Sequence, residues 1–142
     1  MLFRSRVAIE PEAAALAAAY ADASERKAIS AGLERMQAAE KGLDDTLDAD
    51  IAFHVAILKA SGNPFFVQFQ DIVATALQTS IQFTNRVKGR SASVADHAAV
   101  KEAIMRRHPE NAHAAMRKII SDVLDLIEDA KPGAAPAKSR RR

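Results

Sequence analysis

Asp50 and His54 are the two side chains whose types and spacing point most directly to chemistry. Residues four apart lie on one face of a helix, one turn from each other. A carboxylate and an imidazole in that arrangement can bind a single divalent cation. The alternative is a simple hydrogen bond between them, which is the commoner outcome for an isolated D-x-x-x-H sequence. The pair alone leaves both interpretations open.

Enzymatic chemistry finds little support in the rest of the sequence. The chain has no cysteine, which excludes disulfides, cysteine metal ligands and a thiol nucleophile. It also lacks the H-E-x-x-H, G-x-S-x-G and glycine-rich phosphate-loop motifs of common enzyme families. A metal-dependent hydrolase remains an alternative, but no acidic residue beside Asp50 and His54 is an obvious base. We expect a protein that is not an enzyme.

The composition predicts one all-α domain. The 142 residues are 49% hydrophobic, and they include only five glycines and five prolines. Alanine supplies much of the apolar fraction, a balance that favours helices over strands. No apolar run approaches the length that spans a membrane, and the N-terminus lacks an apolar signal core. We therefore expect a cytoplasmic protein.

The charge is divided unevenly along the chain. The formal net charge is +2, but residues 131–142 carry five basic side chains and no acidic one, so the remainder carries −3. That remainder lacks the basic stripe typical of a nucleic-acid-binding surface. We expect a folded domain over residues 1–130 and a disordered basic tail over 131–142.

The spacing of apolar residues predicts about six helices that form an antiparallel bundle. The first is expected to have Pro11 in its opening turn, and the fourth to begin at Pro64 with Asn63 as its N-cap. Because the fourth helix is apolar for much of its length, we expect it to be the central and most buried one. The predicted helices cover approximately residues 7–21, 24–41, 43–61, 64–86, 94–107 and 109–130.

The stretch that follows Asp50 carries a family resemblance. The sequence Asp50-Ile-Ala-Phe-His54 runs into Ala60-Ser-Gly-Asn-Pro64, and this stretch resembles the FCD family, the C-terminal ligand-binding domain of FadR-type GntR transcription regulators. Three further segments are similar to the family's and fall in the same order. They are Arg6-Val-Ala-Ile-Glu-Pro11, Asp96-His-Ala-Ala-Val-Lys-Glu-Ala-Ile104 and Ala112-His-Ala-Ala-Met-Arg117.

The resemblance implies a helical bundle with a central cavity, where much of the family binds a metal ion through one aspartate and three histidines. Matched residue by residue, it implies Asp50, His54 and His97 as ligands, with zinc or nickel the most plausible metal. Ile119 stands where the family has its last histidine. His113 lies six residues before it, so on a helix it points about 120° away, and His108 precedes that helix. Neither is a good replacement.

The family also binds small organic acids at or near the metal. The resemblance implies that Arg6 binds a carboxylate effector, which suits the planar guanidinium fork. The alternative is an ordinary surface ion pair with Glu10, four residues on. Asn85 and Arg86, near the end of the fourth predicted helix, are further candidates for the effector site.

The resemblance thus implies the effector-sensing and dimerisation domain of a transcription regulator, expected as a homodimer. Such regulators bind DNA through a winged helix-turn-helix that precedes this domain, and we expect this chain to lack that half. The alternative is a structural dimerisation module that has lost its ligand. Its signature would be a collapsed surrounding of Asp50, with His97 turned away.

Overall fold

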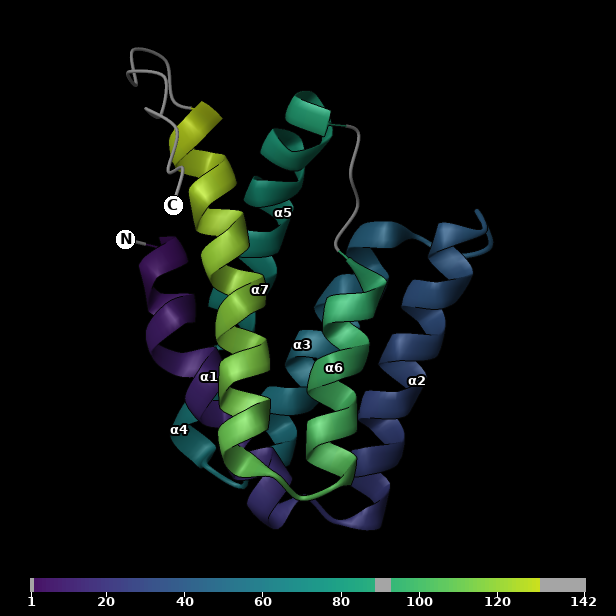
Figure 1. The fold of residues 1–142 in the computed structure, drawn as a ribbon, viewed down its shortest axis with the longest axis vertical. Coiled ribbons are helices and arrows are strands. Elements are labelled where there is room, and N and C mark those ends of the chain that lie inside the picture. The colour runs from purple at the N-terminus through teal and green to yellow at the C-terminus, as the bar shows by residue number, and fades with distance from the viewer. Residues whose placement is uncertain (1, 89–92, 131–142) are drawn as a thin grey trace.

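The chain folds into helices only, over the residues that the computed structural model describes, 2–88 and 93–130 (Figure 1). For residues 82–88 and 130 it describes the backbone alone. Seven helices are present in these ranges: α1 Leu2–Tyr20, α2 Ala23–Glu40, α3 Thr46–Ala60, α4 Pro64–Val67, α5 Gln70–Lys88, α6 Val94–Met105 and α7 Pro109–Ala130. The all-α bundle predicted from the sequence is therefore confirmed.

Short polar side chains begin four of these helices. Asp22, Asp45 and Ser93 each accept a hydrogen bond from the backbone N–H three residues on, at the starts of α2, α3 and α6. At the start of α4, Asn63 accepts from the backbone N–H of Phe65. These bonds satisfy N–H groups that have no partner inside the helix, and these four predicted starts agree with the structure to within three residues. The first predicted start is wrong, because α1 begins at Leu2 rather than at residue 7 and has Pro11 in its interior rather than in its opening turn.

The fourth predicted helix is in fact two. α4 ends at Val67, and α5 begins at Gln70 after a turn at Gln68 and Phe69. In that turn the N–H of Phe69 donates to the carbonyl of Phe66, a tighter bond than the α-helical one. Neither glycine nor proline marks the break, so the sequence pattern missed it.

The prediction that this apolar segment forms the most buried helix is wrong. Phe65 is 71% exposed, whereas Phe53 and Leu58 of α3 are fully buried. α3 packs against α1, α2 and α5, and seven of its fifteen residues are buried. It is also the helix that carries Asp50 and His54.

Small residues allow the helices around α3 to approach closely. α1 presents a buried face of alanines, Ala13, Ala14, Ala17 and Ala18, and packs against α3 and α7. On α2, a Cβ added to Gly32 would lie 2.9 Å from the Cα of Phe53. Among the described residues, no helix is long and apolar enough to cross a lipid bilayer.

Candidate metal centre

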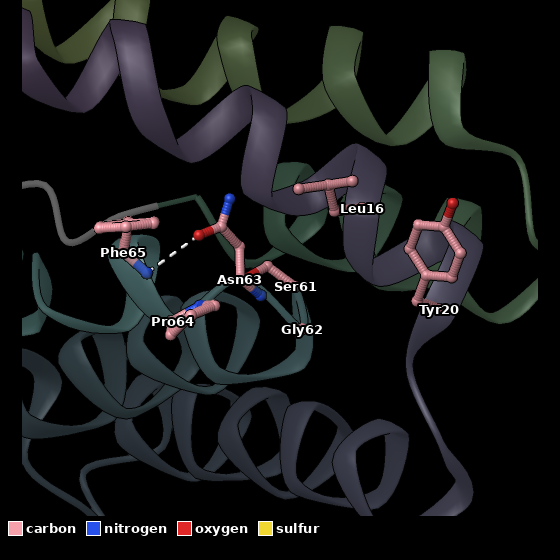
Figure 2. Close-up of a pocket in the computed structure, with 7 residues that line it drawn as sticks. All are labelled: Leu16, Tyr20, Ser61, Gly62, Asn63, Pro64 and Phe65. Carbon is pink, nitrogen blue, oxygen red and sulfur yellow. Dashed lines mark hydrogen bonds between the residues drawn. The ribbon is translucent and has the colours of Figure 1, made fainter.

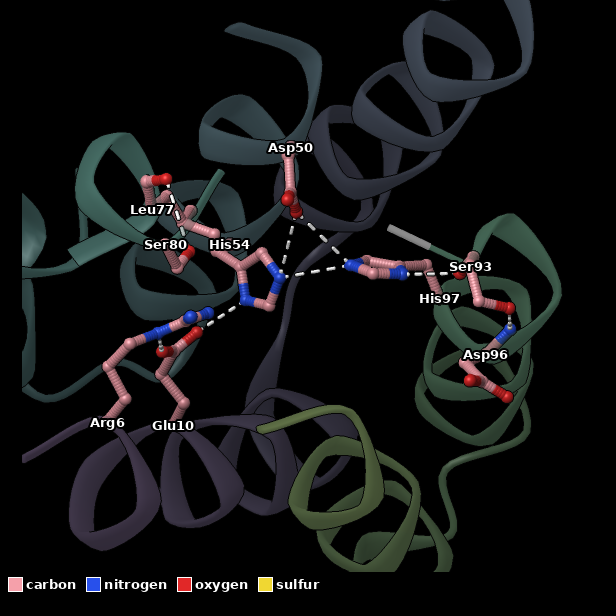
Figure 3. A network of polar contacts seen from close by, with 9 residues as sticks. All are labelled: Arg6, Glu10, Asp50, His54, Leu77, Ser80, Ser93, Asp96 and His97. Atoms are coloured by element: carbon pink, nitrogen blue, oxygen red, sulfur yellow. Dashed lines mark hydrogen bonds and ion pairs between the residues drawn. The ribbon is translucent and has the colours of Figure 1, made fainter. Parts of the chain in front are cut away.

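Three predicted ligands converge where α3 faces α6 (Figure 3). Asp50 and His54 come from α3 and His97 comes from α6. The Oδ1 atom of Asp50 lies 3.2 Å from the Nε2 atoms of both histidines, and those two nitrogens lie 3.1 Å apart. Both imidazoles are buried, and the Asp50 side chain is 13% exposed.

The spacing of these three atoms fits a metal ion. Bonds of about 2.0–2.2 Å from imidazole and carboxylate ligands to one cation place the ligand atoms roughly 3–3.5 Å apart. All three sides of the observed triangle fall in that range. One ion above the triangle can therefore reach all three atoms without a change of the helix positions.

Each histidine binds an acceptor through its other ring nitrogen. The Nδ1 atom of His97 donates to the backbone carbonyl of Ser93 at 2.7 Å, and the Nδ1 atom of His54 donates to the carboxylate of Glu10. These bonds place the hydrogen of a neutral imidazole on Nδ1 and the lone pair on Nε2. Both lone pairs then face the triangle.

When both imidazoles are neutral, three acceptor atoms therefore face one another at the centre of the triangle. In that state the buried Asp50 Oδ1 receives no hydrogen bond, and its two neighbours are the Nε2 atoms. A proton on one Nε2 would satisfy one side of the triangle and leave the others as close contacts between acceptors. A divalent cation satisfies all three atoms at once, so the donor set fits a metal.

Burial and charge act in opposite directions on the pKa values here. Burial raises the pKa of Glu10, but the positive charges of Arg6 and His54 outweigh it and lower that pKa to about 2. Burial lowers the pKa of His54, while the charges and hydrogen bonds of Glu10 and Asp50 raise it to about 9. For Asp50, burial is likewise outweighed, because hydrogen bonds with His54 and His97 hold its pKa below the usual range.

Glu10 is the residue of the site that the sequence reasoning missed. The sequence spacing predicts Glu10 only as a surface partner of Arg6, yet the structure buries both side chains, each 1% exposed. A signal was present in the sequence. Arg6 and Glu10 continue the helical face that carries Ala13 and Ala17, and charged residues in line with an apolar face are expected to be buried and paired.

Arg6 lies beside this centre, at the start of α1 (Figure 3). Its Nε atom donates to Glu10, so the pairing expected as the alternative does occur, in the interior rather than on the surface. Its two terminal nitrogens, Nη1 and Nη2, are buried and have no hydrogen-bond partner. An arginine held this way has two donors available for an anion.

The family of the chain follows from a comparison of its sequence with known domains. A family model described as the FCD domain matches residues 1–122. The chain belongs to the FCD domain family. This confirms the resemblance that rested on four sequence segments. A comparison with curated proteins gives no match.

A solved structure, that of Streptococcus agalactiae GntR, has the same fold as this FCD domain. The two align with a TM-score of 0.70 at 24% sequence identity, over 86% of this chain and 55% of the other. The chain thus spans about half the length of that protein, and the likeness concerns the fold.

Three further positions were considered for a fourth metal ligand, and none of them belongs to the triangle. Ile119 of this FCD domain is buried in the hydrophobic core, so the place of the family's last histidine is apolar. His113 instead contacts Glu12 at 3.1 Å on the surface, and His108 is exposed before α7. Within the described ranges, the group able to hold a metal is made of Asp50, His54 and His97.

Asn85 and Arg86 were predicted to take part in the effector site. Their side chains lie outside the described residues, and their assignment stays a prediction. The same applies to the basic tail over 131–142.

The A-S-G-N-P segment serves the turn between α3 and α4 and borders a surface pocket of about 550 Å³ (Figure 2). Gly62 has a positive φ of 69°, which favours glycine. The hydroxyl of Ser61 donates to the carbonyl of Leu58 and accepts from the N–H of Asn63. The polar groups of this motif are used within the turn, and the pocket shares no residue with the triangle.

Proposed function

We propose that this FCD domain is the effector-sensing domain of a GntR-type transcription regulator. In this proposal a divalent metal ion binds to Asp50, His54 and His97, and a small carboxylate effector binds to Arg6. The observation that carries it is the buried triangle of three ligand atoms, one from each residue, that lie 3.1–3.2 Å from one another.

The ligand types favour a particular class of metal. Two imidazoles and one carboxylate suit zinc, nickel and related transition metals better than magnesium or calcium. Three protein ligands leave at least one coordination position for water or an oxygen of the effector. With Ile119 in the core in place of a fourth ligand, we expect weaker binding than at a four-ligand site.

The effector class follows from Arg6. Its Nη1 and Nη2 atoms are buried and without a partner, which is costly for a charged group. A carboxylate accepts two parallel hydrogen bonds from such a pair of nitrogens. A small organic acid therefore removes the cost and adds a bidentate contact.

Binding rather than catalysis is the activity that this site supports best. Hydrolysis by a metal-bound water needs a base placed beside it. The nearest further carboxylate is that of Glu10, and its oxygens are engaged by Arg6 and His54. A sensor needs only a ligand that binds two arrangements of the bundle unequally.

The whole regulator extends beyond these residues. By analogy with GntR regulators, we propose that it is a cytoplasmic homodimer that binds DNA through a winged helix-turn-helix outside this domain. The competing hypothesis of a dimerisation module without a ligand expects His97 to turn away from Asp50. Their 3.2 Å contact supports the sensor instead.

The test is metal analysis of the purified domain with paired variants. We expect about one ion of zinc or nickel per chain in the wild type, and its loss in Asp50→Ala and in His97→Ala. Asp48→Ala and His113→Ala are matched controls, because Asp48 is exposed on the same helix and His113 pairs only with Glu12 at the surface. Both controls are expected to keep the ion.

Two results would contradict the proposal. One is a wild-type protein that contains no metal and is not stabilised by added zinc or nickel. The other is a loss of metal that is equal in the site variants and in the two controls, because the metal would then be bound elsewhere.

A further inference from the structure

Glu10 forms a bridge between Arg6 and His54. Its Oε2 atom accepts from the Nε of Arg6, and its Oε1 atom accepts from the Nδ1 of His54. All three side chains are no more than 1% exposed, so water does not compete for these bonds. One carboxylate is therefore shared between the candidate effector residue and a candidate metal ligand (Figure 3).

The bond to His54 affects how well that ring can bind a metal. A carboxylate that accepts the Nδ1 hydrogen fixes the tautomer and the ring orientation, and it makes Nε2 more basic. The Nε2 atom is the one that faces Asp50 and His97. The stronger the pull of Glu10 on His54, the better a ligand His54 becomes.

The bond to Arg6 weakens that pull. The guanidinium charge beside Glu10 attracts the same carboxylate at a site where both side chains are 1% exposed. An anion on the free Nη1 and Nη2 atoms would neutralise Arg6 or draw it away from Glu10. Either change leaves more of the carboxylate's negative charge to act on His54.

We propose that Glu10 is a positioning residue that couples the two sites, so that a carboxylate on Arg6 and a metal ion on the triangle each strengthen the binding of the other. This inference rests on the proposed function. It adds the sign of the regulation and the residue that transmits it. Because the coupling is a free energy between two ligands, it must be equal in both directions.

The experiment is a zinc titration by calorimetry, with sodium acetate as the probe and sodium chloride at the same ionic strength as its control. In the wild type we expect acetate to lower the zinc Kd at least about fivefold, the low end of typical coupling between sites. In Glu10→Gln we expect zinc binding about 10–100-fold weaker, as for lost support of a metal-bound histidine, and no effect of acetate.

Glu12→Gln is the matched control. Glu12 lies on the same helix and also contacts a histidine, His113, but it is 59% exposed. We expect this variant to keep both the wild-type zinc Kd and the acetate effect. In metal-free protein at a pH high enough to keep His54 neutral, nitrogen chemical shifts should also report a Nδ1-protonated His54 in this control and mixed tautomers in Glu10→Gln, which a general loss of stability would not produce.

Acetate that bound directly to the metal would also tighten zinc binding, but it would do so without Glu10. An acetate effect that persists in Glu10→Gln therefore overturns the inference, as does a zinc Kd that is equal in Glu10→Gln and Glu12→Gln. Wild-type protein that binds zinc with no response to acetate overturns the inference alone. Wild-type protein that binds no zinc overturns the proposed function as well.

Glu10→Gln leaves the Arg6 charge buried without a counter-charge, which destabilises the fold. A second variant that removes both charges avoids this cost. This double variant combines Arg6→Met with Glu10→Gln, and the single variant Arg6→Met is its control. The inference expects the double variant to bind zinc more weakly than the single one, because only the single one keeps the carboxylate on His54. Equal affinities contradict it.

Discussion

Ile119 is the residue at which this chain departs from a four-ligand site. The family resemblance implies a histidine at this place, and the structure puts an isoleucine there, 6% exposed within the core. Core burial means that the position offers no water to complete an imidazole's hydrogen bonds. A histidine there would depend on the metal for its partner.

We predict that Ile119→His binds zinc more tightly than the wild type. Without metal, the buried imidazole should cost about 1–3 kcal/mol of unfolding free energy. Added zinc should recover that loss and exceed it, because a fourth ligand closes the coordination shell. Urea unfolding with and without zinc measures both effects.

Ile120→His is the matched control for this substitution. Ile120 is the next residue and is also buried, at 1% exposed, but it points about 100° away around the helix. We expect the same loss of stability without metal and no recovery with zinc. Recovery in both variants would mean that Ile119 holds no special place beside the metal.

The contact between α2 and α3 sets the position of the ring that supports both histidines. Phe53 packs edge-on against His54 and His97, with ring centroids 5.7 and 5.1 Å away. Behind Phe53, α2 approaches so closely that only glycine fits at Gly32. Gly32 thus fixes the position of α3 beside the candidate metal centre.

We predict that Gly32→Ala destabilises the protein by about 1–3 kcal/mol, the usual cost of overfilling a packed core. The new Cβ would meet backbone atoms of Phe53, which have no free side-chain end to move. The direction of the change in unfolding free energy is informative, because a glycine-to-alanine change at an exposed helical position stabilises a protein by about 1 kcal/mol. Chemical unfolding of Gly32→Ala measures the effect, and a gain in stability would refute the close packing. Ala31→Gly, at the exposed neighbouring position, calibrates the helix-propensity difference.

At the scale of elements, the sequence predicted those helix boundaries that depend on residues close together in the chain. The start of α4 was predicted from its cap Asn63, whose bond spans two positions, and the caps that the structure shows for α2, α3 and α6 are equally local. The break between α4 and α5 and the burial of α3 depend on what other helices cover, and periodicity carries no such information. The same limit explains Phe65, an apolar residue that is exposed because none of the described helices covers its side chain.

The candidate site divides in the same way. Asp50 and His54 follow from helical spacing, whereas the approach of His97 joins positions 43 residues apart. The family resemblance proposed that contact, and the geometry of the three side chains agrees with it. Glu10 joins His54 across 44 positions. The local spacing of four residues predicted only the pairing of Glu10 with Arg6.

For the whole molecule, we predict opposite pH dependences with and without zinc. In the metal-free protein the pKa of His54 is raised from 6.5 to about 9. Its contribution to stability is therefore full below pH 6.5 and is lost as the pH rises through about 9. The pKa of Glu10 is lowered from 4.5 to about 2, so its contribution is present above pH 4.5 and is lost as the pH falls toward 2.

Zinc needs the neutral imidazole, so the stabilisation it provides should grow as the proton leaves. Melting temperatures at pH 6 and pH 8.5, with chelator and with zinc, measure this difference. We expect the gap between the two conditions to be wider at pH 8.5. Asp50→Asn should show no gap at either pH, and a wild-type gap that does not change with pH would contradict the prediction.

The placement of the triangle on α3 and α6 would also make a bound ion a cross-link between these helices. A metal bound to His54 and His97 closes a loop across 43 positions in a chain that has no cysteine. If the ion stays on both histidines while the rest of the chain opens, such a closure is worth about 4 kcal/mol in the chain-entropy description of disulfides. Chelation would then act as reduction does in a secreted protein, by releasing α4 and α5 from a loop with pinned ends.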